Sequence, residues 1–122
     1  MKYDDQNVFA KILRGEIPCN KIYEDDFVLS FHDIKPQKKI HALVIPKGKY
    51  IDLDDFSLNA SSEEIVGLLK GINIVANKLG ISTETGKGYR ALSNVSEDGG
   101  QEVPHLHFHL FGGENVGKMV VW

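Results

Sequence analysis

The chain has 122 residues, 42% of them hydrophobic, which is enough for a single domain spanning residues 1–122 with one apolar core. Its formal charge of −3 at pH 7 excludes the overall basic field that attracts nucleic acid of any sequence, so an anionic ligand has to be bound by local groups. The single cysteine, Cys19, excludes a disulfide within the chain and is compatible with a reducing compartment.

Residues 1–16 contain no apolar stretch of the length found in signal peptides, and no apolar run in the chain is long enough to cross a bilayer. We therefore expect a cytoplasmic protein that functions without membrane contact. Internal repeats, low-complexity tracts and long linkers are also absent from the sequence, which again favours one unit.

Short elements of mixed type are expected along the chain. Residues 7–15 predict a small helix, with Asn7 as N-cap and Gly15 at its end. Apolar runs bounded by turn residues then predict five strands. These strands are expected at residues 21–24, 27–34, 40–46, 88–94 and 105–111. A further short strand is expected at residues 119–122.

A long helix is expected between the third and fourth of these strands. Ser61 and Glu64 form a capping-box pattern at its start, and Gly80 is suited to its end. A stripe of apolar residues with helical spacing predicts the face that packs on the sheet. Its members are Ile65, Leu68, Leu69, Ile72, Val75, Ala76 and Leu79.

Gly67, Gly71 and Ile74 lie on a different face of this helix. A glycine inside a helix costs roughly 1 kcal/mol relative to alanine, so two of them indicate the close approach of another backbone. We expect this face to meet the same helix of a second subunit in a homodimer. The alternative is that both glycines lie beneath a loop of the same chain.

Three histidines at alternating positions, His105, His107 and His109, are the most distinctive feature of the sequence. Alternate residues of a strand share a face, so the three imidazoles are expected on one side and the residues between them in the core. An imidazole row facing a cleft, a ligand or solvent has two chemical uses, which are metal binding and catalysis.

Metal binding is the first alternative. Neighbouring histidines of a flat strand are about 6.6 Å apart and the outer two about 13 Å, whereas zinc binds nitrogen at about 2.0–2.1 Å. One strand is therefore poorly suited to wrapping all three rings around an ion. A site built from two of the three with His41 or His32 stays possible, although the sequence has no cysteine pair or H-E-x-x-H motif.

Catalysis at a phosphate is the second alternative. A neutral imidazole nitrogen attacks phosphorus and forms a transient covalent intermediate, while neighbouring rings bind phosphoryl oxygens. Gly99 and Gly100, just before the histidines, allow backbone N–H groups to approach an anion, and Gly112 and Gly113 end the strand without adding bulk. The glycine pairs on both sides favour a phosphate ligand.

The motif HLHFHLF resembles that of the histidine triad (HIT) superfamily, and NVFAKILRGEIP, FHDIKPQ, HALVIPK, GYR and DGGQ follow the order of its Hint branch, the histidine triad nucleotide-binding proteins. This resemblance implies an α+β fold with a five-stranded, mainly antiparallel sheet and one long and one short helix, joined across a homodimer. It also implies hydrolysis of purine nucleoside phosphoramidates or adenylylated compounds through a nucleotidyl-histidine intermediate, with no metal or other cofactor.

The resemblance also implies roles for individual residues. His107 matches the nucleophile, His109 contacts the phosphate, His105 supports the site and His41 orients the nucleophile. Without the resemblance, His41 in an apolar strand reads as a core residue. The expected catalytic set is therefore His41, His105, His107 and His109.

Substrate-binding roles follow in the same way. Asp33 matches the residue that accepts hydrogen bonds from the ribose diol, and Asn94 matches an asparagine beside the phosphate. From the sequence alone, both are equally suited to turns. The nucleobase pocket is implied to consist of Val8, Phe9, Ile12, Phe31, His32 and Ile34.

The phosphate loop is implied to include Gly100, Gln101 and Glu102. A carboxylate at position 102 departs from a pattern that often has a small hydroxyl residue there, and it repels a phosphate. We expect Glu102 to offer its backbone N–H and to turn its side chain outward. Other classes of function that stay open are a dinucleoside polyphosphate hydrolase, a non-catalytic nucleotide-binding protein and a zinc-binding protein.

Overall fold

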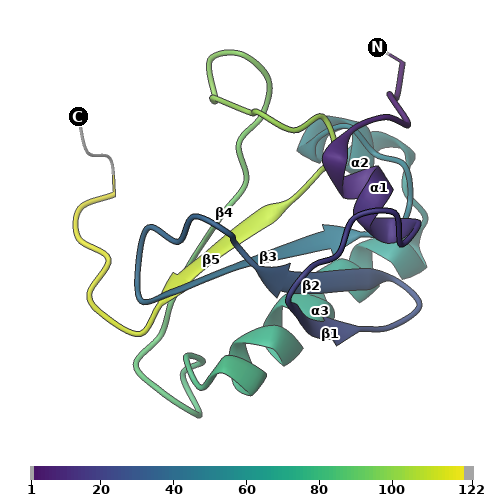
Figure 1. Cartoon of the computed structure of the whole chain (residues 1–122). Helices are drawn as coiled ribbons and strands as arrows, with labels where there is room; N and C mark the ends of the chain where they lie inside the picture. Colours follow the sequence, from purple (N-terminus) through teal and green to yellow (C-terminus); the bar gives the residue numbers. More distant parts are fainter. Residues whose placement is uncertain (1, 120–122) are drawn as a thin grey trace.

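A computed structural model describes residues 2–119, and its centre is a five-stranded sheet in the order β1-β2-β3-β5-β4 (Figure 1). All four neighbouring pairs of strands are antiparallel. The strands are β1 (Lys21–Glu24), β2 (Val28–His32), β3 (Ile40–Pro46), β4 (Arg90–Leu92) and β5 (Phe108–Gly112). The expected α+β class and five-stranded sheet are confirmed.

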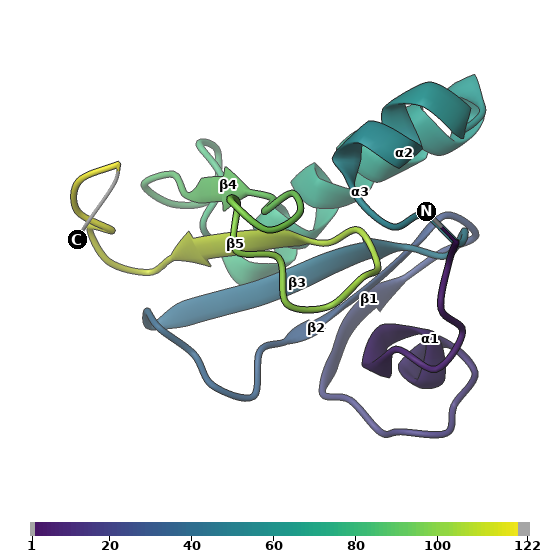
Figure 2. The same cartoon turned by 90° about the horizontal axis from the view of Figure 1, so that it is seen from above.

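Helices cover both faces of the sheet, with α1 (Val8–Leu13) on one side and α2 (Leu53–Asn59) and α3 (Ser62–Leu79) on the other (Figure 2). The short and the long helix were expected, and their caps are present. The Asn7 side chain accepts a hydrogen bond from the Ala10 N–H at 2.9 Å. Ser61 and Glu64 form the capping box, and α3 ends at Gly80 with φ of 72°.

Helix α2 was not expected from the sequence. Only Phe56 among its seven residues is buried, so there is no apolar stripe of helical period to reveal it. Its start carries a local signal, since the Asp52 side chain accepts a hydrogen bond from the Asp55 N–H. The helix fills the connection between β3 and α3.

The central strands β2 and β3 are buried on both faces because helices lie on each side. Val28 and Val44 belong to the apolar cluster under α3. Phe31 and Leu43 belong to a second cluster, with Phe9 of α1. This arrangement explains why the strand sequences are nearly continuous apolar runs instead of alternating ones.

Two details of α3 differ from expectation. Leu69, expected to pack on the sheet, is 62% exposed, so the buried face of α3 is narrower than the apolar stripe in its sequence. A Cβ atom at Gly67 would lie 2.5 Å from Phe27, and one at Gly71 would lie 2.8 Å from Val28. The close approach that explains both glycines is thus that of the β1–β2 hairpin of the same chain.

The histidine strand is shorter than expected. Strand β5 begins at Phe108, a bend covers residues 103–105, and residues 106–107 belong to no strand. The three imidazoles therefore do not lie in a row on one flat strand. His105 is completely buried and His107 is 5% exposed, so the expectation of a ring that faces a cleft, a ligand or solvent is wrong for His105.

No helix within residues 2–119 is both long and apolar enough to cross a membrane. The short strand expected at residues 119–122 falls mostly outside the described residues, and Met119, which is described, belongs to no strand.

Candidate active site

A cavity of about 200 Å³ opens on the α1 side of the sheet. It brings together residues from α1, the chain after β2, the loop before β5 and β5 itself. The residues lining it are Phe9, Asp33, Gln37, Leu43, Asn94, Gly100, Glu102, Val103, His107 and His109. Seven of these ten were expected as site residues from the sequence, which makes this cavity the candidate active site.

His107 is held by two contacts. Its Nδ1 lies 2.7 Å from the backbone carbonyl oxygen of His105, and the Phe9 ring packs edge-on against its ring at a centroid distance of 4.9 Å. Because a carbonyl only accepts hydrogen bonds, the His107 proton is assigned to Nδ1. In the neutral ring, Nε2 then carries a lone pair, and no hydrogen-bond partner for it is found within residues 2–119.

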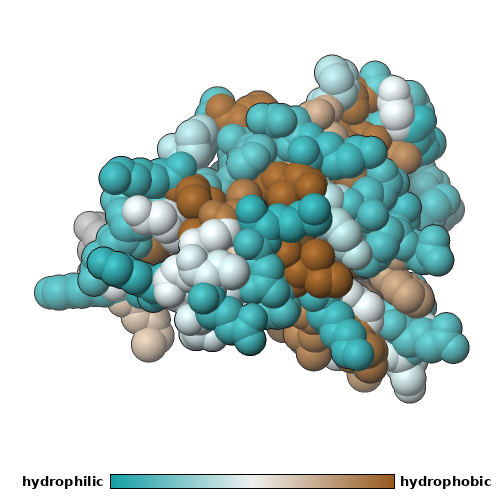
Figure 3. All heavy atoms as spheres, turned by 90° about the horizontal axis from the view of Figure 1, so that it is seen from below, coloured by the Kyte–Doolittle hydropathy of each residue, from teal (hydrophilic) through white to brown (hydrophobic). Residues whose placement is uncertain are grey.

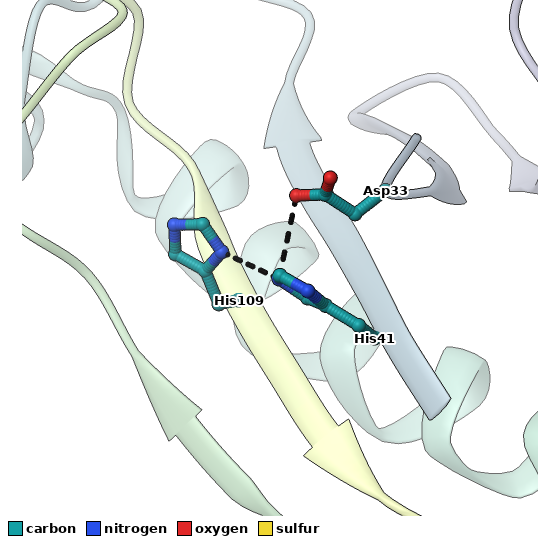
Figure 4. Close-up of side chains that lie close together, drawn as sticks. All are labelled: Asp33, His41 and His109. Carbon is teal, nitrogen blue, oxygen red and sulfur yellow. Dashed lines mark hydrogen bonds and ion pairs between the residues drawn. The ribbon is translucent and has the colours of Figure 1, made fainter. Parts of the chain in front are cut away.

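His109 is held in the opposite tautomer through His41 (Figure 4). The Gln37 backbone N–H donates to His41 Nδ1 at 3.2 Å, so the neutral His41 ring carries its proton on Nε2. That Nε2 lies 2.9 Å from His109 Nδ1 and 3.4 Å from Asp33 Oδ2. His109 Nδ1 therefore accepts the hydrogen bond from His41 Nε2–H, and the neutral His109 ring carries its proton on Nε2.

His105 is buried, and its side chain does not line the cavity. Its Nε2 lies 2.8 Å from the Pro46 carbonyl oxygen, and its Nδ1 lies 2.6 Å from the Tyr3 hydroxyl. The same residue provides the carbonyl that fixes His107. The expected supporting position of His105 thus corresponds to a fully hydrogen-bonded ring behind the nucleophile candidate.

Burial keeps the clustered histidines neutral at pH 7. Desolvation, aided by the neighbouring His107, lowers the pKa of His105 from 6.5 to about 4. Burial, with His107 and His41 nearby, lowers the pKa of His109 to about 4 as well. Burial also lowers the pKa values of His41 and His107, partly opposed by the charge of Asp33. A neutral imidazole has the free lone pair that nucleophilic attack requires.

The loop before β5 uses its glycines for its own shape. A Cβ atom at Gly99 would lie 2.4 Å from the Val95 carbonyl oxygen, and Gly100 has a φ of 74°. The Gly100 N–H donates to Glu97 and the Gln101 N–H to Ser96, so these two groups are not free to bind an anion. Gly100 itself lines the cavity, as expected, and a role of this loop in binding a phosphate stays a prediction.

Gln101 and Glu102 differ in how they use their side chains. The Gln101 amide donates to the carbonyls of Ile51 and Val103 and accepts from the Ser96 N–H, so it braces the loop. Glu102 lines the cavity and is exposed overall, and its charge opposes the lowering of the His107 pKa. Its backbone N–H has no bonded acceptor in the described part of the chain.

The expected nucleobase residues are not all at the cavity. Phe9 lines it, while Phe31 and Ile12 lie in the adjoining apolar cluster. Ile34 is 92% exposed and Val8 is 40% exposed. The structure therefore offers an apolar surface at the edge of the cavity, beside α1, and not a closed slot.

The side chain of His32 is expected to point away from this apolar surface. It follows Phe31 in β2, and successive residues of a strand point to opposite faces.

Three lining residues were missed from the sequence. Leu43 alternates with His41 in β3, so strand periodicity would have placed it on the same face. Gln37 and Val103 come from loops, where no periodicity indicates which way a side chain points.

A metal ion has one candidate set of ligands among the described residues. Asp33, His41 and His109 each offer an atom, and these atoms lie within 4.8 Å of one another. The set includes His41, as expected, but only one residue of the triad, and it leaves out His32. Binding an ion there would displace the proton shared between His41 and His109. The same atoms therefore either bind a metal or form the hydrogen bond that fixes the tautomer of His109.

Comparison with known proteins defines the family. Residues 14–116 match the HIT domain family. A HIT-like protein of Azospirillum brasilense is 54% identical over 118 residues, which cover 97% of this chain and 94% of that protein. The solved structure of a HIT family hydrolase from Clostridium thermocellum has a TM-score of 0.84 at 35% identity, and the match covers 97% of this chain and 99% of that one. The chain belongs to the HIT domain family.

A relative of named activity adds to this. The purine nucleoside phosphoramidase of Escherichia coli K12 is 38% identical over 117 residues, which cover 95% of this chain and 94% of that protein. Its match extends across the residues that form the candidate active site.

Proposed function

We propose that this HIT protein is a hydrolase of purine nucleoside phosphoramidates or related adenylylated compounds and that His107 is its nucleophile. The observation that carries the proposal is the pair of opposite tautomers at the cavity. His107 Nδ1–H is bound to the His105 carbonyl, which leaves Nε2 as a free lone pair. His109 Nδ1 accepts from His41, which leaves Nε2–H as a free donor. A lone pair beside a hydrogen-bond donor suits attack on a phosphoryl group.

In the first step, His107 Nε2 attacks the α-phosphorus and forms a nitrogen–phosphorus bond. The bond from phosphorus to the amine breaks, and the amine leaves after taking a proton from solvent. His109 Nε2–H donates a hydrogen bond to a phosphoryl oxygen as charge develops there. The product of this step is a nucleotidyl-His107 enzyme.

In the second step, water attacks the same phosphorus, the bond to His107 breaks and the mononucleotide is released. The water gives up a proton to solvent, and the enzyme regains its starting state. Dividing one displacement into two steps is the usual advantage of covalent catalysis. The proposed steps involve no metal or cofactor.

Asp33, Asn94 and Glu102 are proposed to bind the substrate. Asp33 Oδ1 accepts a hydrogen bond from the Lys35 N–H, and the carboxylate has further lone pairs for ribose hydroxyls. Asn94 lines the cavity beside the imidazoles, and the Glu102 backbone N–H is the proposed phosphate donor. The cavity is smaller than a typical ligand site of about 300–1,000 Å³, so the base extends over the apolar surface beside α1.

The central test compares wild type with His107→Ala on an adenosine phosphoramidate while AMP affinity is measured separately. We expect turnover to fall by about 1,000-fold or more and AMP affinity to stay within a few-fold, because a nucleophile contributes to the transition state far more than to ground-state binding. Equal turnover would remove His107 as nucleophile. Glu84→Ala, an exposed position in the loop after α3 and away from the cavity, is the matched control and is expected to keep wild-type turnover.

The same assay distinguishes the proposed activity from the alternative functions. Faster turnover of a dinucleoside polyphosphate than of the phosphoramidate would assign the chain to another activity of the superfamily. AMP binding without turnover of either compound would make it a nucleotide-binding protein. Trapping adenylylated protein by mass spectrometry in wild type, and not in His107→Ala, would support the covalent route.

Zinc binding is a second candidate function because Asp33, His41 and His109 converge. It predicts stoichiometric zinc that survives dialysis and is lost in His41→Ala. Activity unaffected by chelators, in protein shown to be free of zinc, would exclude a metal role in the reaction.

A homodimer with joined sheets is part of the proposal. Three features of the surface support it. On α3, Val66 is 51% exposed and Leu69 is 62% exposed, and an apolar groove of about 560 Å³ lies beside Phe27 and Ile74. Figure 3, which views the molecule from below the orientation of Figure 1, shows hydrophobic side chains among hydrophilic ones on that face. Strand β4 lies at the edge of the sheet and, among residues 2–119, pairs with β5 alone.

The homodimer is tested by light scattering or sedimentation at micromolar concentration. A mass of twice that of one chain is expected. The mass of a single chain would end this part of the proposal.

A further inference from the structure

The hydroxyl of Tyr3 lies 2.6 Å from Nδ1 of His105, a residue 102 positions later in the chain. The two rings also meet edge-on, with a centroid distance of 5.6 Å and an interplanar angle of 72°. Tyr3 lies before residues 14–116, the part that matches the HIT domain family. The contact therefore joins the N-terminal segment, which lies outside that match, to the first histidine of the triad.

The proton positions around His105 follow from its partners. The Pro46 carbonyl only accepts, so His105 Nε2 carries the proton and donates it. Burial lowers the pKa of His105 to about 4, so the ring is neutral at pH 7 and Nδ1 has a lone pair. Burial raises the pKa of Tyr3, so its hydroxyl keeps its proton and donates to that lone pair. Both nitrogens of a completely buried ring are thus satisfied.

The same residue carries the carbonyl that receives Nδ1–H of His107, at 2.7 Å. This hydrogen bond fixes the tautomer of His107 and aims its free Nε2. Because the His105 ring is held at both nitrogens, the backbone at residue 105 has little freedom to move away from His107. We propose that Tyr3 is a positioning residue, whose hydroxyl orients the nucleophile His107 by holding the ring of His105; this inference rests on the proposed function.

The N-terminal segment is itself tied to the body of the protein, so the hydroxyl is presented at a defined place. The Asp5 side chain pairs with Lys49 at 2.8 Å, and the Asp5 carbonyl accepts from the Arg14 guanidinium at 2.8 Å. The Asn7 side-chain amide donates to the Asp4 carbonyl at 2.7 Å. These contacts lie on both sides of the turn that leads into α1.

The test is Tyr3→Phe, which keeps the ring and removes only the hydroxyl. We expect kcat for the adenosine phosphoramidate to fall roughly tenfold while AMP affinity stays within about twofold, because a hydrogen bond to a buried acceptor is lost and the nucleophile is less well aimed. The matched control is Tyr23→Phe, whose hydroxyl also bonds a side chain, Asp25, at 2.8 Å, but outside the site. It is expected to leave kcat unchanged.

A spectroscopic measurement separates positioning from general loss of stability. In ¹⁵N and ¹H spectra of the histidine rings, Tyr3→Phe is expected to shift the His105 Nδ1 resonance and to weaken the His107 Nδ1–H hydrogen bond, and Tyr23→Phe to do neither. Wild-type kcat in Tyr3→Phe, unchanged ring resonances, or an equal loss of kcat in Tyr23→Phe would each overturn the inference. If wild type does not turn over phosphoramidates, the proposed function fails, and the ring resonances alone decide the role of Tyr3.

Discussion

On the α3 face of the sheet, Val28, Val44 and Leu110 are completely buried in an apolar cluster. On the α1 face, the same strands have apolar residues along only part of their length. Along β3, Ile45 and Leu43 lie in the cluster against α1, and the next residue on that face is His41. The face becomes polar where the cover of α1 ends, and the candidate active site lies at that boundary.

The two faces bury side chains of different kinds. On the α3 face, the burial of apolar surface raises the free energy of unfolding, and this effect does not depend on the direction of individual contacts. The α1 face buries imidazoles, each of which needs a partner of the correct polarity. His105 and His41 have partners on both nitrogens, whereas His107 and His109 each retain one nitrogen for a ligand. Changes on the two faces should therefore affect different measurements.

The largest expected effect is on the α3 face. Leu110→Ala removes a completely buried side chain and is expected to lower the free energy of unfolding by about 2–5 kcal/mol. Because Leu110 points away from the cavity, kcat at a temperature where the variant is folded should change by less than about threefold. Urea unfolding and steady-state kinetics measure the two quantities. A large loss of kcat with unchanged stability would show that the faces are not separable.

On the α1 face, His41→Leu tests whether His41 fixes the tautomer of His109, because leucine keeps an apolar side chain of similar volume and has no N–H donor. Loss of the Nε2–H donor frees His109 to change its tautomer, and kcat is expected to fall roughly 10- to 100-fold. Ser30→Ala is a matched control, since Ser30 is completely buried and its hydroxyl donates to the Leu43 carbonyl at 2.8 Å without touching a histidine. It should reduce stability by about 1 kcal/mol and leave kcat unchanged. Equal kcat losses in both variants would contradict a specific role for His41.

The pH dependence of stability should also come from the α1 face. Folding lowers the pKa of His105 and His109 from 6.5 to about 4. Between these values the unfolded chain binds protons that the folded chain does not, so stability is fully present above pH 6.5 and is lost as the pH falls towards 4. Urea midpoints measured across this range test it. A His105→Gln variant should show a shallower slope, and an identical slope would contradict the assignment.

The smallest expected effect is at Glu102. Its carboxylate is at the cavity, where it repels a phosphate, so Glu102→Ser is expected to raise phosphoramidate turnover by about two- to fivefold. The repulsion is screened because the side chain is exposed, and the gain should shrink at high salt. Lower turnover in Glu102→Ser would indicate that the carboxylate helps the reaction.

Local patterns in the sequence predicted the elements that have strong local signals. Asn7, Ser61, Glu64 and Gly80 mark helix ends through hydrogen bonds and a backbone conformation that depend on a few neighbouring residues. Helix α2 was missed because it buries one side chain and has no periodicity. The strand expected at residues 105–111 was found in the right place but begins only at Phe108, since the alternation of residue types extends through residues 105–107, which do not pair in the sheet.

The candidate site divides in the same way. Its residue types and order, including His107, Asp33 and Asn94, were readable from motifs, and the cavity does bring these three together. The tautomer of each histidine was not readable, because it depends on partners far along the chain, such as Gln37 for His41 and Pro46 for His105. The position of Ile34, expected in a pocket and found 92% exposed, was also set by the fold.

By itself, the sequence determined the ends of α1 and α3, the presence of five strands and the set of imidazoles, because each of these depends on neighbouring residues or on short periodicities. Only the tertiary structure decided which ring nitrogens are free and where the glycines of α3 pack. Those features depend on hydrogen bonds and contacts between distant segments, as when Tyr3 meets His105 and Phe27 meets Gly67. Such contacts form only when the whole chain is folded.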